Sequence, residues 1–356
     1  MDKLRIGLIG YGKMMGAHIK AVNLLDTVEI SAVCDVIEKN AREVAKVLTN
    51  NPKVYTDYHK ILDDVDAVLI ALPHDLHFEC GMYFALHQKH ILMEKPLCNS
   101  EEECIRLIET CDKMGVTLMC AYPVRFWRGV VKLKELIDSG EYGEIIQMSI
   151  WTEQLTGIGA DYSSEIAPWS VTNRVGGGQF FSHGCHYIDV LLWFLGNPVQ
   201  GAHLGTRNGT PWMLREGTSA AIIRFENGAL AYHGATWGAR GTRLGYDFQI
   251  QTEKGMLEYY HSGNEIRLYN KSNVHAPGAA NESDIYEVIW KGNDAPGTYT
   301  KHEIQYFADC VNTGKEPMTS GKKALQSLRV IWKMYEAEKN SSIADLRGLG
   351  LDNAMP

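Results

Sequence analysis

The chain has 356 residues, of which 45% are hydrophobic and 22% are charged, and this balance is typical of a globular protein with two domains. The formal net charge of −8, without any basic run or basic–aromatic stripe, excludes a nucleic-acid partner. No uncharged apolar stretch is long enough for a membrane helix and no signal-peptide pattern is present, so we expect a cytoplasmic protein with no membrane partner.

The first third of the chain alternates short apolar runs with helical patterns. The runs that are apolar enough for buried strands are Leu4–Ile9, Val28–Cys34, Ala67–Ala71, His90–Met93 and Thr117–Cys120. The helical patterns between them are Met15–Leu25, Glu38–Leu48, Phe78–Gln88 and Ser100–Met114. Strands that alternate with helices predict a parallel sheet with helices on both faces, so we expect an α/β domain over residues 1–121.

Beyond Tyr122 the pattern changes to longer alternating segments. A helix is predicted over Trp127–Ser139, and two late helices over His302–Val311 and Lys322–Glu338. The predicted strands are Ile145–Glu153, Thr218–Phe225, Ala229–Trp237, Gln249–Thr252 and Met256–Tyr260, with an Asn-Gly hairpin turn at 227–228. Residues 270–300 are rich in turn formers and are expected to be irregular. We therefore expect an α+β domain with a largely antiparallel sheet over residues 122–356.

Eight cysteines are scattered along the chain and none forms a Cys-x-x-Cys pair. This spacing excludes zinc-ribbon and thioredoxin-type sites. We expect free thiols that are buried or partly buried.

A glycine-rich turn follows the first predicted strand directly. Gly10 allows the tight turn and Gly12 lets the backbone approach a pyrophosphate, which would sit at the N-terminus of the next helix. Met15 stands where the strict pattern has a small residue, and Gly16 follows it. A strand–turn–helix junction without any ligand can have the same residues, so the turn alone is a weak signal.

Asp35 strengthens that signal because it follows the second predicted strand. It lies 23 residues beyond Gly12. A dinucleotide-binding fold has, about 20 residues on, the carboxylate that accepts hydrogen bonds from the ribose hydroxyls. A carboxylate there repels a 2′-phosphate, so the cofactor is predicted to be NAD rather than NADP. The alternative is that Asp35 only caps the following helix.

Glu94-Lys95-Pro96 follows the apolar run His90–Met93, and ligands of open α/β sheets bind at the carboxyl ends of strands. Proline there fixes the backbone, with a cis bond as one way of doing so. Further motifs with characteristic spacing are His18, Leu72-Pro73-His74-Asp75-Leu76-His77, Ala121–Phe126, Gly176–Gly178 and Gly184–Asp189. With these motifs in order, the chain resembles the glucose–fructose oxidoreductase/inositol dehydrogenase family (Gfo/Idh/MocA) over essentially its whole length.

The resemblance implies a Rossmann domain followed by an α+β domain with an open, mainly antiparallel sheet. That sheet commonly forms subunit interfaces in the family, so a homo-oligomer is expected. The implied activity is an NAD(H)-dependent oxidoreductase that oxidises or reduces a hydroxyl or ketone carbon. Its substrate would be a small-molecule carbohydrate: a sugar, a cyclitol or a glycoside.

The resemblance also implies two catalytic residues, Lys95 and His186. Alcohol oxidation releases a proton, for which histidine is a suitable base near neutral pH, and lysine can stabilise the developing alkoxide. Without the resemblance, His186 is equally typical of the start of the apolar helix Tyr187–Leu195. The family often has aspartate where this chain has Ser182, which leaves the acid–base details open. His183 and His186 have a His-x-x-His spacing, but no carboxylate or cysteine pattern accompanies them, and no metal is predicted.

The remaining site residues are implied by the same resemblance. The cofactor is expected to contact Gly10, Tyr11, Gly12, Lys13, Met14, Asp35, Leu72, Pro73, His74, His77, Glu94 and Lys95. The substrate is expected to contact Tyr122, Arg125, Trp151, Glu153, Trp169, Asn173, Arg174, Ser182, His183 and His186.

Two other functions fit the same motifs. One is a redox-neutral enzyme that keeps NAD tightly bound and oxidises a sugar only transiently, with glycoside cleavage or epimerisation as the outcome. The other is a non-catalytic dinucleotide-binding regulator, against which the presence of both Lys95 and His186 argues.

Overall fold

The computed structural model describes residues 3–11, 15–156, 177–270, 286–293 and 299–353. By their contacts, the described residues divide into two compact units. The first unit runs to Phe126 and also takes in the described residues of Ala295–Leu325. The second unit begins at Trp127, and near the end of the chain it resumes at Gln326. The segment up to Leu325 therefore belongs with the first unit, whereas a second domain over residues 122–356 was expected.

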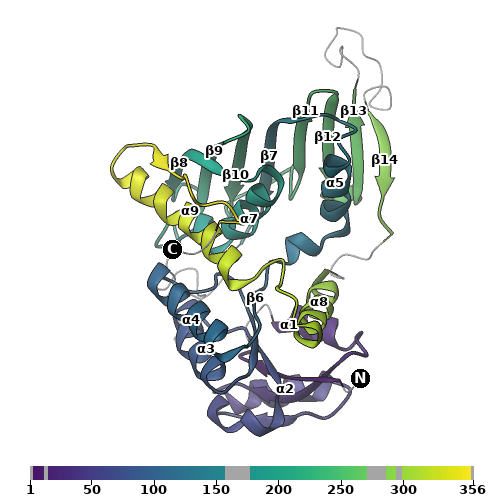
Figure 1. The fold of residues 1–356 in the computed structure, drawn as a ribbon, viewed down its shortest axis with the longest axis vertical. Coiled ribbons are helices and arrows are strands. Elements are labelled where there is room, and N and C mark those ends of the chain that lie inside the picture. The colour runs from purple at the N-terminus through teal and green to yellow at the C-terminus, as the bar shows by residue number, and fades with distance from the viewer. Residues whose placement is uncertain (1–2, 12–14, 157–176, 271–285, 294–298, 354–356) are drawn as a thin grey trace. The chain divides into compact units, whose positions relative to one another are not determined.

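A parallel sheet forms the centre of the first unit (Figure 1). Its strands are β1 (Leu4–Ile9), β2 (Val28–Cys34), β3 (Lys53–Tyr55), β4 (Ala67–Ile70), β5 (His90–Met93) and β6 (Leu118–Cys120). In the described residues their order is β3-β2-β1-β4-β5-β6, and every neighbouring pair is parallel. The order reverses between β1 and β4, so a crevice for ligands is expected at the carboxyl ends of these strands. This sheet confirms the predicted Rossmann fold.

Helices pack on the parallel sheet because their apolar faces complete its core. They are α1 (Met15–Val22), α2 (Glu38–Val47), α3 (His77–Leu86), α4 (Glu101–Met114) and the late helix α8 (Tyr299–Thr313). Short 3-10 turns are η1 (Tyr58–Lys60), η2 (Leu62–Asp64), η3 (His74–Leu76) and η4 (Pro123–Phe126). Helix α8 packs against α1, and its fully buried Phe307 belongs to the same core cluster as Met15 and Ile19. The late helix thus supports the helix that begins beside the glycine-rich turn.

A mixed sheet forms the centre of the second unit. Its strands are β7 (Ile145–Glu153), β8 (Pro198–Thr206), β9 (Thr218–Phe225), β10 (Leu230–Thr236), β11 (Phe248–Thr252), β12 (Gly255–Tyr260), β13 (Glu265–Tyr269), β14 (Glu287–Lys291) and β15 (Ala344–Asp345). In the described part of the chain their order is β14-β13-β12-β11-β7-β10-β9-β8-β15, antiparallel except between β7 and β10. The open, mainly antiparallel sheet is confirmed.

The helices of this unit cover one face of the mixed sheet (Figure 1). They are α5 (Arg128–Asp138), α6 (Gln179–Ser182), α7 (Gly184–Leu195) and the part of α9 (Gly321–Lys339) that follows Leu325, and a 3-10 turn, η6, spans His261–Gly263. Met148, Ile150 and Thr152 of β7 are fully buried on the helix side. No helix covers the opposite face in the described residues.

Several boundaries differ from the predictions. The hairpin at 227–228 is confirmed, with Gly228 at φ +85° between β9 and β10. The expectation of an irregular segment over residues 270–300 was wrong for Glu287–Lys291, which forms the edge strand β14. This strand has no fully buried residue, so the apolar alternation that predicts a strand is weak.

Candidate active site

Four loops meet at the carboxyl edge of the parallel sheet, because parallel strands all end on the same side. They begin with Gly10 after β1, Asp35 after β2, Leu72 after β4 and Glu94 after β5. Gly10 has φ +85°, and a Cβ there would lie 2.7 Å from the carbonyl oxygen of Ala71. Only glycine fits this position, which leaves the backbone open to a closely approaching ligand.

The Asp35 carboxylate joins the two turns that frame the expected ribose position. Its Oδ2 accepts a hydrogen bond from the backbone N–H of Tyr11 at 2.7 Å. Its Oδ1 accepts from the N–H of Ile37 at 2.8 Å, just before α2. The N-cap of α2 is Ile37, whose side chain makes no capping bond, so Asp35 bonds the turn before α2 and does not have the capping role considered as an alternative. Gly12, Lys13 and Met14, which were also expected to bind the cofactor, lie outside the described residues.

Two buried histidines, His74 and His77, follow β4, and the His77 ring reaches the loop after β5. The His77 ring has Nδ1 2.9 Å from the Pro96 carbonyl oxygen and Nε2 3.0 Å from that of Leu72. Burial lowers the pKa of His77, and burial together with the nearby His77 and Lys95 lowers the pKa of His74 well below its usual range. Both rings are therefore neutral near pH 7. The Lys95–Pro96 bond is cis, as the sequence analysis suggested.

Glu94 is buried and charged beside Lys95. Burial disfavours its carboxylate, but the hydrogen bond from His18 and the charges of His18 and Lys95 outweigh burial and lower the pKa of Glu94. The His18 Nε2 lies 2.6 Å from Glu94 Oε1. Glu303 of α8 is fully buried nearby, and burial and the charge of Glu94 raise its pKa well above its usual range. Glu303 was not predicted as a site residue, because a glutamate in a helix usually indicates an exposed position.

The second unit carries the expected catalytic histidine at the junction of α6 and α7. His183 separates the two helices, and His186 follows in the first turn of α7 with 6% of its surface exposed. The rings of His183 and His186 are 5.7 Å apart and nearly perpendicular. Ser182, which stands in place of the family's aspartate, is fully buried one residue before His183.

Aromatic rings that the sequence analysis did not single out surround His183. The ring centroids of Tyr187, Tyr246 and Trp237 lie 5.3, 6.0 and 6.1 Å from that of His183. Trp237 follows β10 and Tyr246 precedes β11, so they come from strand ends on either side of β7 in the sheet order. Such rings suit the C–H faces of a sugar. Trp237 was predicted only as the last residue of a strand, and no sequence signal pointed to Tyr187 or Tyr246 in this role.

The structure does not bring all expected substrate residues together. Trp151 packs its ring 4.9 Å from that of Tyr232 on the helix-free face of the mixed sheet. Its neighbour Thr152 points to the other face, where its Oγ1 is 3.1 Å from His233 Nε2. Glu153 accepts a hydrogen bond from Thr242 at the end of β7.

Of the five other expected substrate residues, two belong to the first unit and three are outside the part of the chain that the structure describes. Tyr122 and Arg125 are both buried and belong to the first unit. Trp169, Asn173 and Arg174 lie outside the described residues.

Three further observations concern the cysteines, metal binding and membrane-spanning helices. All eight cysteines are free and buried, as expected. Among the residues that the structure describes, no group of three histidine, cysteine, aspartate or glutamate side chains is arranged to hold a metal ion. In the same residues, no helix combines the length and apolar character needed to cross a membrane.

Comparison with known proteins identifies several named proteins that are similar to this chain. Myo-inositol 2-dehydrogenase of Thermotoga maritima is 26% identical over 99% of this chain and 100% of its own length. D-xylose 1-dehydrogenase (NADP⁺) 2 of Haloferax volcanii is 27% identical over 89% of this chain and 92% of its own. Among solved structures, levoglucosan dehydrogenase in complex with NADH and levoglucosan has a TM-score of 0.82 at 21% identity, covering 97% of this chain and 100% of that one. This last likeness shows the shared fold.

Two family models match the chain in succession. The model of the oxidoreductase family with an NAD-binding Rossmann fold matches residues 4–122, which hold the whole parallel sheet. The model of the GFO/IDH/MocA C-terminal domain matches residues 130–258. Because the two matches together span more than half of the chain, the protein belongs to the GFO/IDH/MocA family of NAD-binding oxidoreductases.

Proposed function

We propose that this oxidoreductase transfers a hydride between NAD and a hydroxyl-bearing carbon of a sugar, cyclitol or glycoside. One observation carries the proposal: Lys95 leaves the same edge of the parallel sheet as Gly10 and Asp35. A cation there lies where the reactive end of a dinucleotide is expected, with the ribose end beside Asp35. The relatives named as inositol and xylose dehydrogenases support this substrate class.

Bound NAD would supply the hydride acceptor or donor, and the turn at Gly10 and the carboxylate of Asp35 would hold it. His186 takes the hydroxyl proton during oxidation, since imidazole titrates near neutral pH. Lys95 stabilises the negative charge that develops on the same oxygen. The neutral His77 ring lies between the Leu72 and Pro96 carbonyl oxygens and donates its single N–H to one of them, which helps to hold the Lys95 loop. The neutral His74 beside Lys95 adds no competing positive charge.

We further propose a division of roles along the chain. Residues 1–121 bind the dinucleotide and residues 122–356 bind the substrate and form the subunit interface. In the second part, the partly exposed ring of Tyr246 beside His183 is proposed to face the sugar, and the buried rings of Trp237 and Tyr187 support His183 from behind.

The proposed interface is the helix-free face of the mixed sheet, which makes the protein a homo-oligomer. Leu204 and Ile222 are 73% and 53% exposed there, and Tyr232 is paired directly beside Ile222. Exposed apolar side chains that lie close together on a sheet face are typical of subunit contacts. We also propose a cytoplasmic location, because eight free thiols suit a reducing compartment. Fractionation of cells that express the protein tests the location.

The test of the activity is a panel of free sugars, inositols and glycosides, each offered with NAD and with NADP. We expect NADH to accumulate with at least one substrate and NAD to be preferred. Conversion of a glycoside or epimer without any NADH would instead indicate the redox-neutral enzyme, and no conversion at all would reject the proposal.

Lys95→Ala should lower kcat at least ~10²-fold while NADH binding is largely kept, because the lysine acts on the developing charge rather than on the cofactor. Lys89→Ala is the matched control, since Lys89 precedes the same strand and donates to the Val65 carbonyl at 2.8 Å. Near-normal turnover in Lys95→Ala, or an equal loss in both variants, would remove Lys95 from the chemistry.

A further inference from the structure

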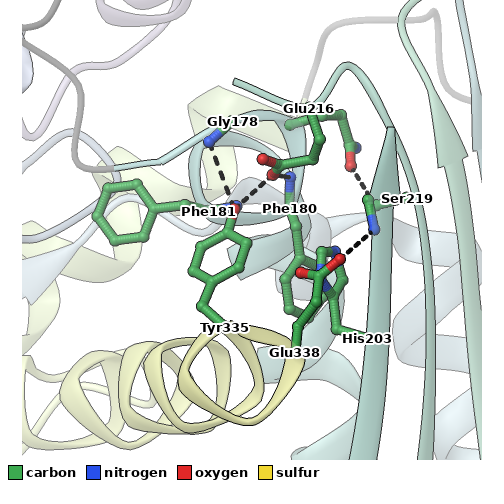
Figure 2. Close-up of polar contacts among 10 residues, drawn as sticks. Gly178, Phe180, Phe181, His203, Glu216, Ser219, Tyr335 and Glu338 are labelled. Atoms are coloured by element: carbon green, nitrogen blue, oxygen red, sulfur yellow. Dashed lines mark hydrogen bonds and ion pairs between the residues drawn. The ribbon is translucent and has the colours of Figure 1, made fainter. Parts of the chain in front are cut away.

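The short helix α6 begins with four backbone N–H groups that have no partner inside the helix, as every helix does. They belong to Gly178, Gln179, Phe180 and Phe181. Two residues that are distant in sequence, Glu216 and Tyr335, accept hydrogen bonds from all four. Figure 2 shows this cluster, with Tyr335 reaching up from α9 and Glu216 standing above the helix start.

The Tyr335 hydroxyl uses its full hydrogen-bonding capacity in this cluster. Its oxygen accepts from the N–H of Gly178 at 3.3 Å and from that of Phe181 at 3.2 Å. Its proton is donated to the Glu216 carboxylate (Figure 2). Burial and the charge of Glu216 raise the pKa of Tyr335 well above its usual range, so the hydroxyl keeps this proton.

Glu216 supplies the other two acceptors. Its backbone carbonyl accepts from the N–H of Gln179 at 2.8 Å. Its carboxylate oxygen Oε1, which also receives the Tyr335 proton, accepts from the N–H of Phe180 at 3.2 Å. A carboxylate at a helix N-terminus is favoured further by the helix dipole.

The two described glycines of the Gly176–Gly178 triplet allow this close approach. A Cβ on Gly178 would lie 2.3 Å from the Glu216 carbonyl oxygen and 2.4 Å from its carboxyl carbon. A Cβ on Gly177 would lie 2.5 Å from the Cβ of Phe181 and 3.0 Å from the Tyr335 oxygen. The glycines therefore make room for the carboxylate and the hydroxyl.

A second contact from α9 holds the same turn from another side. Glu338, three residues after Tyr335, lies 2.7 Å from His203 Nδ1 and accepts from the N–H of Gly205 at 2.8 Å. The His203 ring stacks on Phe180 with centroids 4.3 Å apart (Figure 2). The backbone and one ring of α6 are thus both anchored to α9.

Hydrogen bonds continue from α6 into the histidine segment. The donors are backbone N–H groups: that of Ser182 bonds the Gly178 carbonyl at 2.9 Å, that of His183 the Gln179 carbonyl at 2.8 Å, and that of His186 the His183 carbonyl at 3.2 Å. Ser219 Oγ donates to Gln179 Oε1 at 2.9 Å, which turns the amide nitrogen toward His183 Nδ1 at 3.5 Å. Any movement of the first turn of α6 therefore displaces His183 and His186.

We propose that Tyr335 and Glu216 are positioning residues that fix the start of α6 and thereby orient His183 and His186. The catalytic consequence rests on the proposed role of His186 as proton acceptor. The structural consequence does not depend on that role. Both residues act through the backbone, so their loss changes the proton transfer rather than the binding of NAD.

The test is Tyr335→Phe in the full-length protein, assayed for oxidation with NAD and the substrate that the panel identifies. We expect kcat to fall roughly 10-fold, because two N–H groups and a carboxylate lose their partner and the histidines shift. KM and the NADH affinity should change less than about twofold, and the acidic limb of the pH–rate profile should move. Glu216→Gln should be milder than Glu216→Ala, because the amide oxygen still accepts from Phe180.

Tyr269→Phe is the matched control, since its hydroxyl donates to Glu258 at 2.8 Å in the same unit without contact to α6. We expect it to keep kcat and the pH profile. If Tyr335→Phe keeps both as well, or if Tyr269→Phe loses as much kcat, the proposed positioning is wrong.

The histidine NMR signals separate this proposal from the proposed function. If the wild-type protein turns over no substrate, the function fails, and the ring signals of His183 and His186 decide the positioning. Shifts of both signals in Tyr335→Phe but not in Tyr269→Phe support it, and unchanged signals overturn it. If Tyr335→Phe does not fold, Glu216→Gln takes its place in both measurements.

Discussion

At the scale of single residues, one carboxylate connects cofactor choice with local structure. Asp35 accepts hydrogen bonds from the backbone of Tyr11 and of Ile37, and it also carries the negative charge that disfavours a 2′-phosphate. Removal of this side chain therefore affects both the cofactor and the turns that frame it.

We expect Asp35→Ser to weaken NAD binding and to relax discrimination against NADP, because the repelling charge is lost. It should also cost about 1 kcal/mol of stability, since the Tyr11 and Ile37 N–H groups lose their acceptor. Asp35→Asn separates the two effects, because it removes the charge but keeps an oxygen acceptor. Dissociation constants for both cofactors and thermal unfolding are the measurements. A native preference for NADP, or an unchanged ratio in both variants, would contradict this interpretation.

Asp247 offers a pH-dependent prediction in the second unit. Burial raises the pKa of Asp247 to about 7, and the negative charge of Glu258 also raises it. A hydrogen bond from the His261 N–H at 2.9 Å acts in the opposite direction but does not offset burial. Between its unfolded pKa near ~4 and about pH 7 only the folded state holds this proton, so this group lowers stability as pH rises. The penalty is complete above about pH 7.

Asp247→Asn should therefore raise the free energy of unfolding at about pH 8, by at most about 4 kcal/mol, and change it little at about pH 4. The amide oxygen still accepts from His261, so the comparison isolates the charge. Urea unfolding of both proteins across this range gives the difference. A difference that does not depend on pH would show that Asp247 keeps its charge in the folded protein.

The site residues that were predictable from sequence lie in motifs next to strand ends, such as Gly10, Asp35 and Lys95. Each is placed by the strand before it, which an apolar run reveals. Tyr335 and Glu303 were not predictable, because they come from late helices. The hydrogen-bond partners of Tyr335 lie 119 or more residues away in sequence, and only folding brings them together.

At the scale of elements, apolar runs predicted the buried strands well. The bounds of β1, β2, β5, β7 and β9 agree with the predictions to the residue. Five strands of the described chain escaped: β3, β8, β13, β14 and β15. Neither β3 nor β14 contains a fully buried residue, so their apolar pattern is weak, and β15 has only two residues. The pairing of α8 with α1 was also unpredictable, since a helix pattern indicates which face is apolar but not which partner covers it.

The contact between α8 and α1 leads to a prediction. Phe307→Ala should cost about 3–5 kcal/mol, because this ring is fully buried. It should also weaken NADH binding, since α1 follows the glycine-rich turn. Phe225→Ala is the matched control, because Phe225 is 1% exposed on β9 of the other unit and should cost similar stability without affecting NADH. Equal NADH affinity in the two variants, measured by fluorescence, would rule out this support.

At the scale of the whole molecule, the helix-free face of the mixed sheet predicts self-association. Ile222→Lys should shift the protein toward the monomer, because charge would then lie within the apolar surface around Leu204 and Tyr232. Leu86→Lys places the same change at a 56% exposed position on α3 and should leave the oligomer intact. Light scattering after size exclusion decides between them, and a monomeric wild-type protein would reject the interface.

The return of α8 to the first unit also has a consequence for synthesis on the ribosome. About 200 residues separate Phe126 from Leu325. At ~5–20 residues per second, the core of the nucleotide-binding unit waits about 10–40 s for its last helix. During that time the apolar side of α1 that later meets Phe307 has no cover from α8. The nascent chain is thus a natural client for a chaperone that shields apolar helices, and release before α8 emerges would expose it to aggregation.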